Sequence, residues 1–140
     1  MTVDRLAPGS GRSEPAPVIL LVEDQPEIRD AVRWLLEDEG FAVETAGDGQ
    51  DALARVTQLR PALIILDMGL PILSGEGVVE GLHELFTQIP PFILMTAAGG
   101  VAERARQLGA AGYVGKPFEL DHLLEVVHRT LELRGSGGRG

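Results

Sequence analysis

The chain has 140 residues, of which 44% are hydrophobic and 24% charged, with a formal net charge of −9 at pH 7. This length and hydrophobicity exclude a disordered chain and favour a single folded domain with a buried core. The absence of Cys excludes disulfides, thiolate metal sites and a cysteine nucleophile. The acidic balance disfavours direct nucleic-acid binding, and no apolar stretch approaches the ~20 residues of a membrane span, so we expect a cytoplasmic protein.

The two ends differ in composition from the rest of the chain. Residues 1–16 are rich in Pro, Gly and Ser and show no apolar periodicity, and residues 134–140 read RGSGGRG. Such compositions are typical of flexible coil. The sequence therefore predicts a disordered N-terminal tail at 1–16, one folded domain at 17–133 and a flexible C-terminal tail at 134–140.

Within the folded part, short apolar runs alternate with amphipathic stretches. The apolar runs predict strands at 17–22, 41–46, 62–66, 92–96 and 112–115. The amphipathic stretches predict helices at 26–40, 47–59, 74–88, 101–109 and 119–133. Gly40 is placed to end the first helix, and Asp48 is placed to cap the start of the second. Strict alternation of this kind predicts an α/β fold with parallel strands and right-handed crossovers.

Polar residues follow the predicted strands where these strands end. In open parallel sheets, ligands bind beyond the carboxyl ends of the strands. The residues at those ends are Glu23, Asp24, Asp67, Thr96 and Lys116. Each alone has an ordinary explanation, because acidic residues before Pro26 can simply cap a helix and Thr is common in strands.

The joint placement is harder to explain without a ligand. Three carboxylates crowded together repel and raise one another's pKa unless a cation lies among them. Lys116 is the only lysine of the chain, in which every other cationic side chain is Arg. A compact ammonium on a flexible stem suits a position where one small cation must reach one oxygen.

Residues 17–133 resemble the receiver domain of two-component response regulators. The resemblance rests on the motifs LVEDQP, LIILDMGLPILSG, ILMTA and YVGKPF, in that order. It implies a flavodoxin-like doubly wound sandwich with strand order 2-1-3-4-5 and five helices. It also implies a signalling module, not an enzyme beyond its own phosphorylation and dephosphorylation, that takes a phosphoryl group from a histidine kinase or phosphotransfer protein. A monomer or weak dimer would then act on a downstream protein target.

The resemblance assigns a metal site and a phosphoacceptor. Asp67 matches the family's phosphoacceptor. Glu23 and Asp24 match the acidic pair that holds Mg²⁺ together with Asp67 and the backbone carbonyl of Met68. Mg²⁺ prefers such hard oxygen ligands.

The resemblance also assigns residues that bind the phosphoryl group and respond to it. Lys116, Thr96 and Ala97 match phosphate-binding positions, and Tyr113 matches the switch residue that moves with Thr96. Pro71 and Gly75 fit the family loop after the phosphoacceptor, and Pro117 matches a proline whose preceding peptide bond is cis.

Two other functions would share part of this residue set. A Mg²⁺ phosphatase with an aspartyl nucleophile needs a second Asp two residues after the first, and position 69 is Gly. A docking receiver that never takes phosphate would lack part of the acidic cluster or the lysine, and all of them are present here.

The sequence also departs from the family pattern. The stretch from Thr96 to Lys116 is slightly short, and this predicts a reduced fourth helix and an altered partner surface. By the resemblance, Gly69 and Ala98 match positions where the family can carry amide or carboxylate side chains that orient water. No output domain follows the last helix, so the chain is expected to be either a stand-alone receiver or a piece of a longer protein.

Overall fold

The structure is a computed structural model that describes residues 17–97 and 99–139, with side chains described as far as residue 132. The tail predicted at residues 1–16 lies outside the described residues. None of the described helices is both long and apolar enough to cross a membrane.

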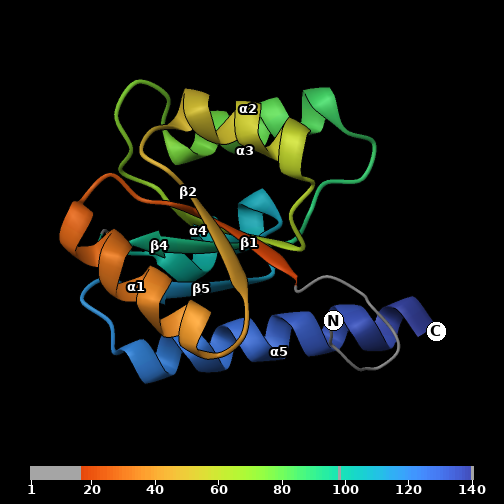
Figure 1. The fold of residues 1–140 in the computed structure, drawn as a ribbon. Coiled ribbons are helices and arrows are strands. Elements are labelled where there is room, and N and C mark those ends of the chain that lie inside the picture. The colour runs from red at the N-terminus through yellow and green to blue at the C-terminus, as the bar shows by residue number, and fades with distance from the viewer. Residues whose placement is uncertain (1–16, 98, 140) are drawn as a thin grey trace.

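Five strands and five helices alternate along the chain, as predicted (Figure 1). The strands are β1 (Val18–Val22), β2 (Ala42–Ala46), β3 (Leu63–Asp67), β4 (Phe92–Thr96) and β5 (Gly112–Gly115). The helices are α1 (Pro26–Asp38), α2 (Gly49–Leu59), α3 (Gly75–Leu85), α4 (Val101–Leu108) and α5 (Leu120–Arg139). All strand pairs are parallel, and the strand order β2-β1-β3-β4-β5 confirms the predicted flavodoxin-like fold.

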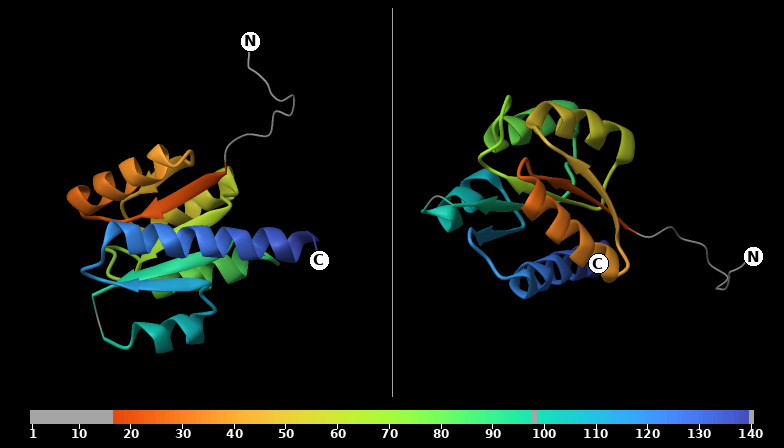
Figure 2. Two further views of the ribbon diagram at one scale, coloured as in Figure 1. Left: turned by 90° about the horizontal axis from the view of Figure 1, so that it is seen from below. Right: turned by 60° about the vertical axis from the view of Figure 1, so that its left-hand side comes forward.

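Both faces of the sheet are covered, which explains why the strands are apolar throughout. Successive strand residues point to opposite faces. Leu20, Ile64 and Leu94 belong to a core with α2, α3 and α4. Ile19 and Ile65 belong to a second core with α1 and α5. Figures 1 and 2 show these helix layers on the two sides of the sheet.

The ends of the helices follow local side-chain chemistry. The Asp48 side chain accepts a hydrogen bond from the backbone N–H of Asp51 at 2.8 Å, which confirms the predicted cap of α2. Gly40, at φ +99°, follows the end of α1, as its position predicts. Ser74 caps α3 by accepting from the N–H of Gly77 at 3.2 Å, so α3 begins one residue later than predicted.

The lengths of α4 and α5 differ in how well they match the prediction. α4 has 8 residues and is the shortest of the five, in line with the short stretch between Thr96 and Lys116. The predicted end of the last helix at residue 133 is wrong, because α5 continues to Arg139 through most of the segment predicted to be a flexible tail. Glycine lowers helix propensity by only about 1 kcal/mol per residue, and this segment contains no proline to stop the helix.

Candidate functional site

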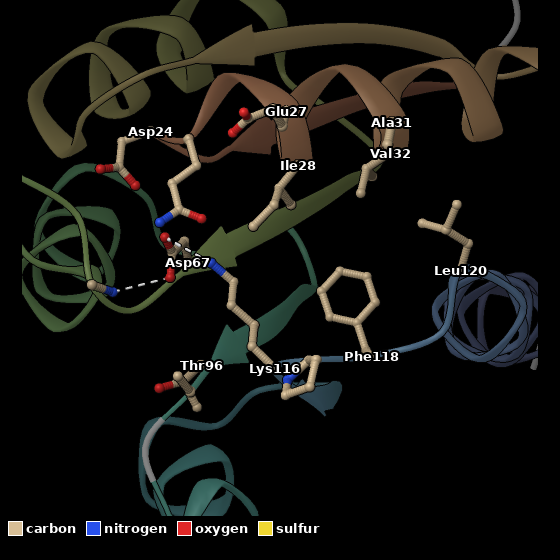
Figure 3. Close-up of a pocket in the computed structure, with 14 residues that line it drawn as sticks. Asp24, Glu27, Ile28, Ala31, Val32, Asp67, Thr96, Lys116, Phe118 and Leu120 are labelled. Carbon is tan, nitrogen blue, oxygen red and sulfur yellow. Dashed lines mark hydrogen bonds and ion pairs between the residues drawn. The ribbon is translucent and has the colours of Figure 1, made fainter.

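Three carboxylates and one ammonium meet at the carboxyl edge of the sheet. Ligand atoms from Glu23, Asp24 and Asp67 all lie within 4.8 Å of one another. The Nζ atom of Lys116 lies 3.0 Å from Oε1 of Glu23 and 3.3 Å from Oδ2 of Asp67. Figure 3 shows Lys116 reaching toward Asp67 from the side opposite Asp24. The structure thus brings together the charged residues that the sequence placed at three strand ends.

Glu23 is fully buried, and its two oxygens have different partners. Oε2 accepts a hydrogen bond from the backbone N–H of Gln25 at 3.1 Å. Oε1 has no well-aligned hydrogen-bond donor among the described residues, so its ion pair with Lys116 is what offsets its burial. Burial raises the pKa of the Glu23 carboxyl, although Lys116 and the Gln25 N–H act in the opposite direction.

Lys116 is held between the two buried acids. Its side chain is 15% exposed, and this burial alone would lower the pKa of the ammonium. The close contact with Glu23 and the negative charges of Asp67 and Glu23 together outweigh burial, so the pKa of Lys116 is raised. The lysine is therefore a fixed cation at neutral pH.

Asp67 ends β3 with both carboxylate oxygens engaged. Oδ1 accepts from the backbone N–H of Gly69 at 3.1 Å, and Oδ2 faces Lys116. The next residue is held by the sheet, since the Met68 N–H donates to the Met95 carbonyl at 2.9 Å. The side chain of Asp67 is thus positioned from the backbone as well as from Lys116.

Gly75 packs directly against this turn. A Cβ atom at position 75 would lie 2.8 Å from Sδ of Met68 and 3.0 Å from the carbonyl oxygen of Asp67. Its N–H points to the Met68 carbonyl at 3.4 Å. Glycine at 75 is therefore what lets the start of α3 approach the Asp67–Met68 backbone.

The remaining predicted residues lie at different distances from this centre. Thr96 ends β4, its carbonyl accepts from the N–H of Lys116 at 2.8 Å, and both Thr96 and Ala97 line the same cleft as Asp67. Tyr113 lies in β5 beside Leu94 with a side chain that is 43% exposed, and it does not line the cleft. Pro71 is exposed in the loop before α3, and the peptide bond between Lys116 and Pro117 is cis, as predicted.

A cleft of about 860 Å³ opens from this centre and extends beyond it. Its polar part includes Asp24, Asp67, Thr96 and Lys116. The other part lies between α1 and the connection from β5 to α5, and is lined by Ile28, Ala31, Val32, Pro117, Phe118 and Leu120 (Figure 3). Sequence reasoning missed this apolar part, because helical periodicity assigned Ile28 and Val32 to the core and gave no conformation for the loop that carries Phe118.

Sequence reasoning also missed the backbone groups that hold the carboxylates. The N–H groups of Gln25 and Gly69 each bind a carboxylate two residues earlier in the chain. The spacing was visible, but the loop conformation that turns each N–H back toward its neighbour was not.

The geometry suits a hard divalent cation beside an anion. Mg²⁺ is held by carboxylate and carbonyl oxygens, and the cluster of Glu23, Asp24 and Asp67 offers such ligands around a buried oxygen that lacks a well-aligned donor. The fixed ammonium of Lys116 can balance further negative charge at Asp67. A carboxylate in such a setting can act as a nucleophile toward a phosphoryl group.

Comparison with known proteins agrees with this chemistry. The family model described as "Response regulator receiver domain" matches residues 19–128. The probable transcriptional regulatory protein TcrX of Mycobacterium tuberculosis is 38% identical over 129 residues, which are 89% of this chain and 54% of that protein. The chain thus spans about half the length of this curated relative.

Solved receiver structures share the fold. The receiver domain of NtrX from Brucella abortus has a TM-score of 0.74 at 34% identity, covering 81% of this chain and 98% of that one. The chemotaxis response regulator CheY4 of Vibrio cholerae has a TM-score of 0.73 at 31% identity, covering 82% of this chain and 98% of that one. The family match, the relatives and the shared fold place this chain in the response regulator receiver domain family, as a signalling module with a phosphoacceptor role.

Proposed function

We propose that Asp67 is the phosphoacceptor of this receiver and that it accepts the phosphoryl group in the presence of Mg²⁺. The observation that supports this proposal most strongly is the position of Asp67 within a cluster of three carboxylates, 3.3 Å from the single lysine of the chain. Glu23, Asp24 and Asp67, with the Met68 carbonyl, would hold the cation, which when bound neutralises charge on the transferring phosphoryl oxygens.

The chain's own residues have separate tasks in the transfer. An oxygen of Asp67 attacks phosphorus and forms an acyl phosphate while the bond between phosphorus and the donor histidine nitrogen breaks, a known type of covalent catalysis. The hydrogen bond from the Gly69 N–H fixes the orientation of the carboxylate. Lys116 keeps its charge close to the oxygens of the phosphoryl group, and its flexible stem lets it follow them.

We further propose that phosphorylation is read out through Thr96 and Tyr113. A phosphoryl group brings about 1.5 to 2 negative charges and strong acceptor oxygens to Asp67. The Thr96 hydroxyl and the Ala97 backbone, which line the cleft, would turn toward it. Tyr113, which is partly exposed in the present state, would then change its exposure and alter the surface around β5.

The physiological donor would be a histidine kinase or a phosphotransfer protein, and the output would be a changed affinity for a downstream protein. We infer that the chain acts in the cytoplasm and has no catalytic turnover beyond its own phosphorylation and dephosphorylation. Its net charge of −9 disfavours direct contact with nucleic acid by this domain.

Incubation with acetyl phosphate and Mg²⁺, followed by intact-mass measurement, tests the proposal. One phosphoryl group is expected on the wild type and none on Asp67→Asn. Asp48→Asn, which changes an acid outside the site, is the matched control and should be labelled normally. Full labelling of Asp67→Asn would remove Asp67 from this role.

A further inference from the structure

The cleft beside Asp67 is larger and more apolar than a phosphoryl group requires. Its volume of about 860 Å³ falls in the range of pockets that hold small organic ligands. Figure 3 shows Ile28, Phe118 and Leu120 turned toward the same space beside the stem of Lys116. Val32, which is fully buried, closes the α1 side.

This apolar space is continuous with the site of phosphoryl transfer. Asp67, Thr96 and Lys116 line one part of the cleft, and Ile28 and Phe118 line another part of the same cleft. A molecule bound there can place an anionic group next to Lys116 and an apolar body against α1 and the β5–α5 connection.

We propose that the cleft is an acyl-binding pocket, which makes Asp67 accept phosphoryl groups from small acyl phosphates with a bulky, uncharged, apolar acyl group in preference to acetyl phosphate. The inference rests on the proposed function of Asp67. It adds the class of small-molecule donor and the residues that select it.

The transfer step is balanced without an additional reactant. An oxygen of Asp67 forms a bond to phosphorus, and the bond between phosphorus and the acyl oxygen breaks. The leaving carboxylate keeps the electron pair, so no proton has to move. Because attacking and leaving oxygens lie on opposite sides of phosphorus, the acyl chain points away from Asp67, and the proposal places it against Ile28 and Phe118.

The charges around the cleft define which acyl chains fit. Lys116 complements the anionic phosphoryl end. Glu27 lines the cleft from the first turn of α1 and is exposed, so an acyl chain with a second negative charge is repelled there. The pocket therefore favours branched alkyl or aromatic acyl groups without charge.

Two alanines allow a matched test of the pocket. Ala31 is an exposed residue of α1 that lines the cleft, so Ala31→Phe fills the apolar space without changing the core. Ala54 is an exposed residue of α2, on the opposite face of the sheet, and Ala54→Phe makes the same substitution outside the cleft. Leu120→Ser, at a residue that is 37% exposed, removes apolar surface from the other wall.

The experiment compares the second-order rate constants for labelling by acetyl, isobutyryl and benzoyl phosphate at one pH and Mg²⁺ concentration, measured by intact mass. Benzoyl phosphate is expected to react about tenfold faster than acetyl phosphate, as apolar pockets discriminate by such factors. This ratio should fall toward one in Ala31→Phe and decrease in Leu120→Ser. The ratio should be unchanged in Ala54→Phe. Because the intrinsic reactivity of each donor is the same for all variants, a change in the ratio between variants can come only from the pocket.

Binding without transfer gives an independent measurement. Phenylphosphonate should bind about tenfold more tightly than methylphosphonate to the wild type. The two phosphonates should bind Ala31→Phe with equal affinity. Equal rates for the three donors, or a ratio that Ala31→Phe leaves unchanged, would overturn the acyl pocket while the role of Asp67 stands. Failure of every donor to label the protein would instead overturn the proposed function.

Discussion

The ammonium of Lys116 lies 3.0 Å from Oε1 of Glu23, a carboxylate that is completely buried. This pair joins the loop after β1 to the loop after β5, two segments far apart in sequence. A buried charge without its partner is strongly destabilising, whereas a complete pair roughly offsets its own desolvation. The single lysine therefore has a structural task in addition to its proposed contact with phosphate.

Lys116→Met is expected to lower the free energy of unfolding by about 3–5 kcal/mol at pH 8, measured in denaturant without Mg²⁺. The loss should become smaller at pH 5. The pKa of Glu23 is raised by folding, so the cost of its ionisation is present above the folded pKa and disappears as pH falls toward the unfolded value. The raised pKa of Lys116 contributes stability that is fully present at both pH 5 and pH 8 and is lost only in alkaline solution, as pH rises through the folded pKa.

The control is the double variant Glu23→Gln with Lys116→Met, which removes both charges. It should be more stable than Lys116→Met at pH 8, and because it lacks Glu23, its free energy of unfolding should change less between pH 5 and pH 8 than that of Lys116→Met. A single variant that is equally destabilised at both pH values would show that removal of Lys116 leaves the pKa of Glu23 unchanged.

Asp24→Ala should weaken Mg²⁺ binding at least about tenfold, because a small hard cation loses one of few charged ligands. Isothermal calorimetry on the unphosphorylated protein measures this affinity directly. Asp30→Ala is the matched control, because Asp30 is an exposed acid of α1 that does not line the cleft. Equal Mg²⁺ affinities for the two variants would exclude Asp24 as a ligand.

The strands and the site residues at their ends could be predicted because both follow from local pattern. Apolar runs such as residues 62–66 have the length and composition of buried strands, and parallel strands bring Asp67, Thr96 and Lys116 to one edge. The motif resemblance then supplied the strand order. Helix ends were less accurate, since the continuation of α5 past residue 133 runs against the low helix propensity of glycine.

Loop conformations could not be predicted in the same way. The contact between Gly75 and the Asp67–Met68 backbone depends on how the intervening loop folds, and no periodic pattern encodes it. The same holds for Ile72 in this loop, which adopts φ +70° although β-branched residues disfavour that region. The apolar half of the cleft was missed for the same reason.

Gly75→Ala should destabilise the protein by about 1–3 kcal/mol, although alanine is the better helix former. The added Cβ would lie within 3.0 Å of Met68 and of the Asp67 carbonyl, so backbone has to move. Gly99→Ala is the control, because a Cβ at position 99 meets no atom within 4 Å. Thermal or denaturant unfolding of both variants measures the difference in stability. Equal stabilities would mean that the backbone at Asp67 and Met68 can move to accommodate the added Cβ without a free-energy cost.

Ile72→Gly should stabilise the protein by about 0.5–1 kcal/mol. Relief of the left-handed conformation adds about 1–2 kcal/mol to the free energy of unfolding. The greater conformational freedom of glycine in the unfolded chain offsets part of this gain. Little burial is lost, since Ile72 is 72% exposed. Ile72→Ala, which keeps a Cβ at the same φ, should not gain the same stability in denaturant unfolding, and a gain as large as that of glycine would contradict the assignment to backbone strain.

The lifetime of the phosphorylated state is expected to depend on position 69. A Cβ at Gly69 would lie 3.9 Å from Oδ1 of Asp67, an ordinary contact, so a side chain there fits beside the acyl phosphate. In the family that the sequence resembles, an amide or carboxylate at this position can orient the attacking water, and glycine cannot. Gly69→Asn should therefore lose its phosphoryl group about tenfold faster than wild type at equal Mg²⁺, a small part of what orientation of a reactant can contribute.

Gly69→Ala separates orientation from solvent access, because its methyl group narrows the path of water without binding it and should leave the rate equal or lower. The decay is followed by intact mass after removal of the donor, and an Asn variant that decays no faster than the Ala variant would show that access of bulk water sets the rate.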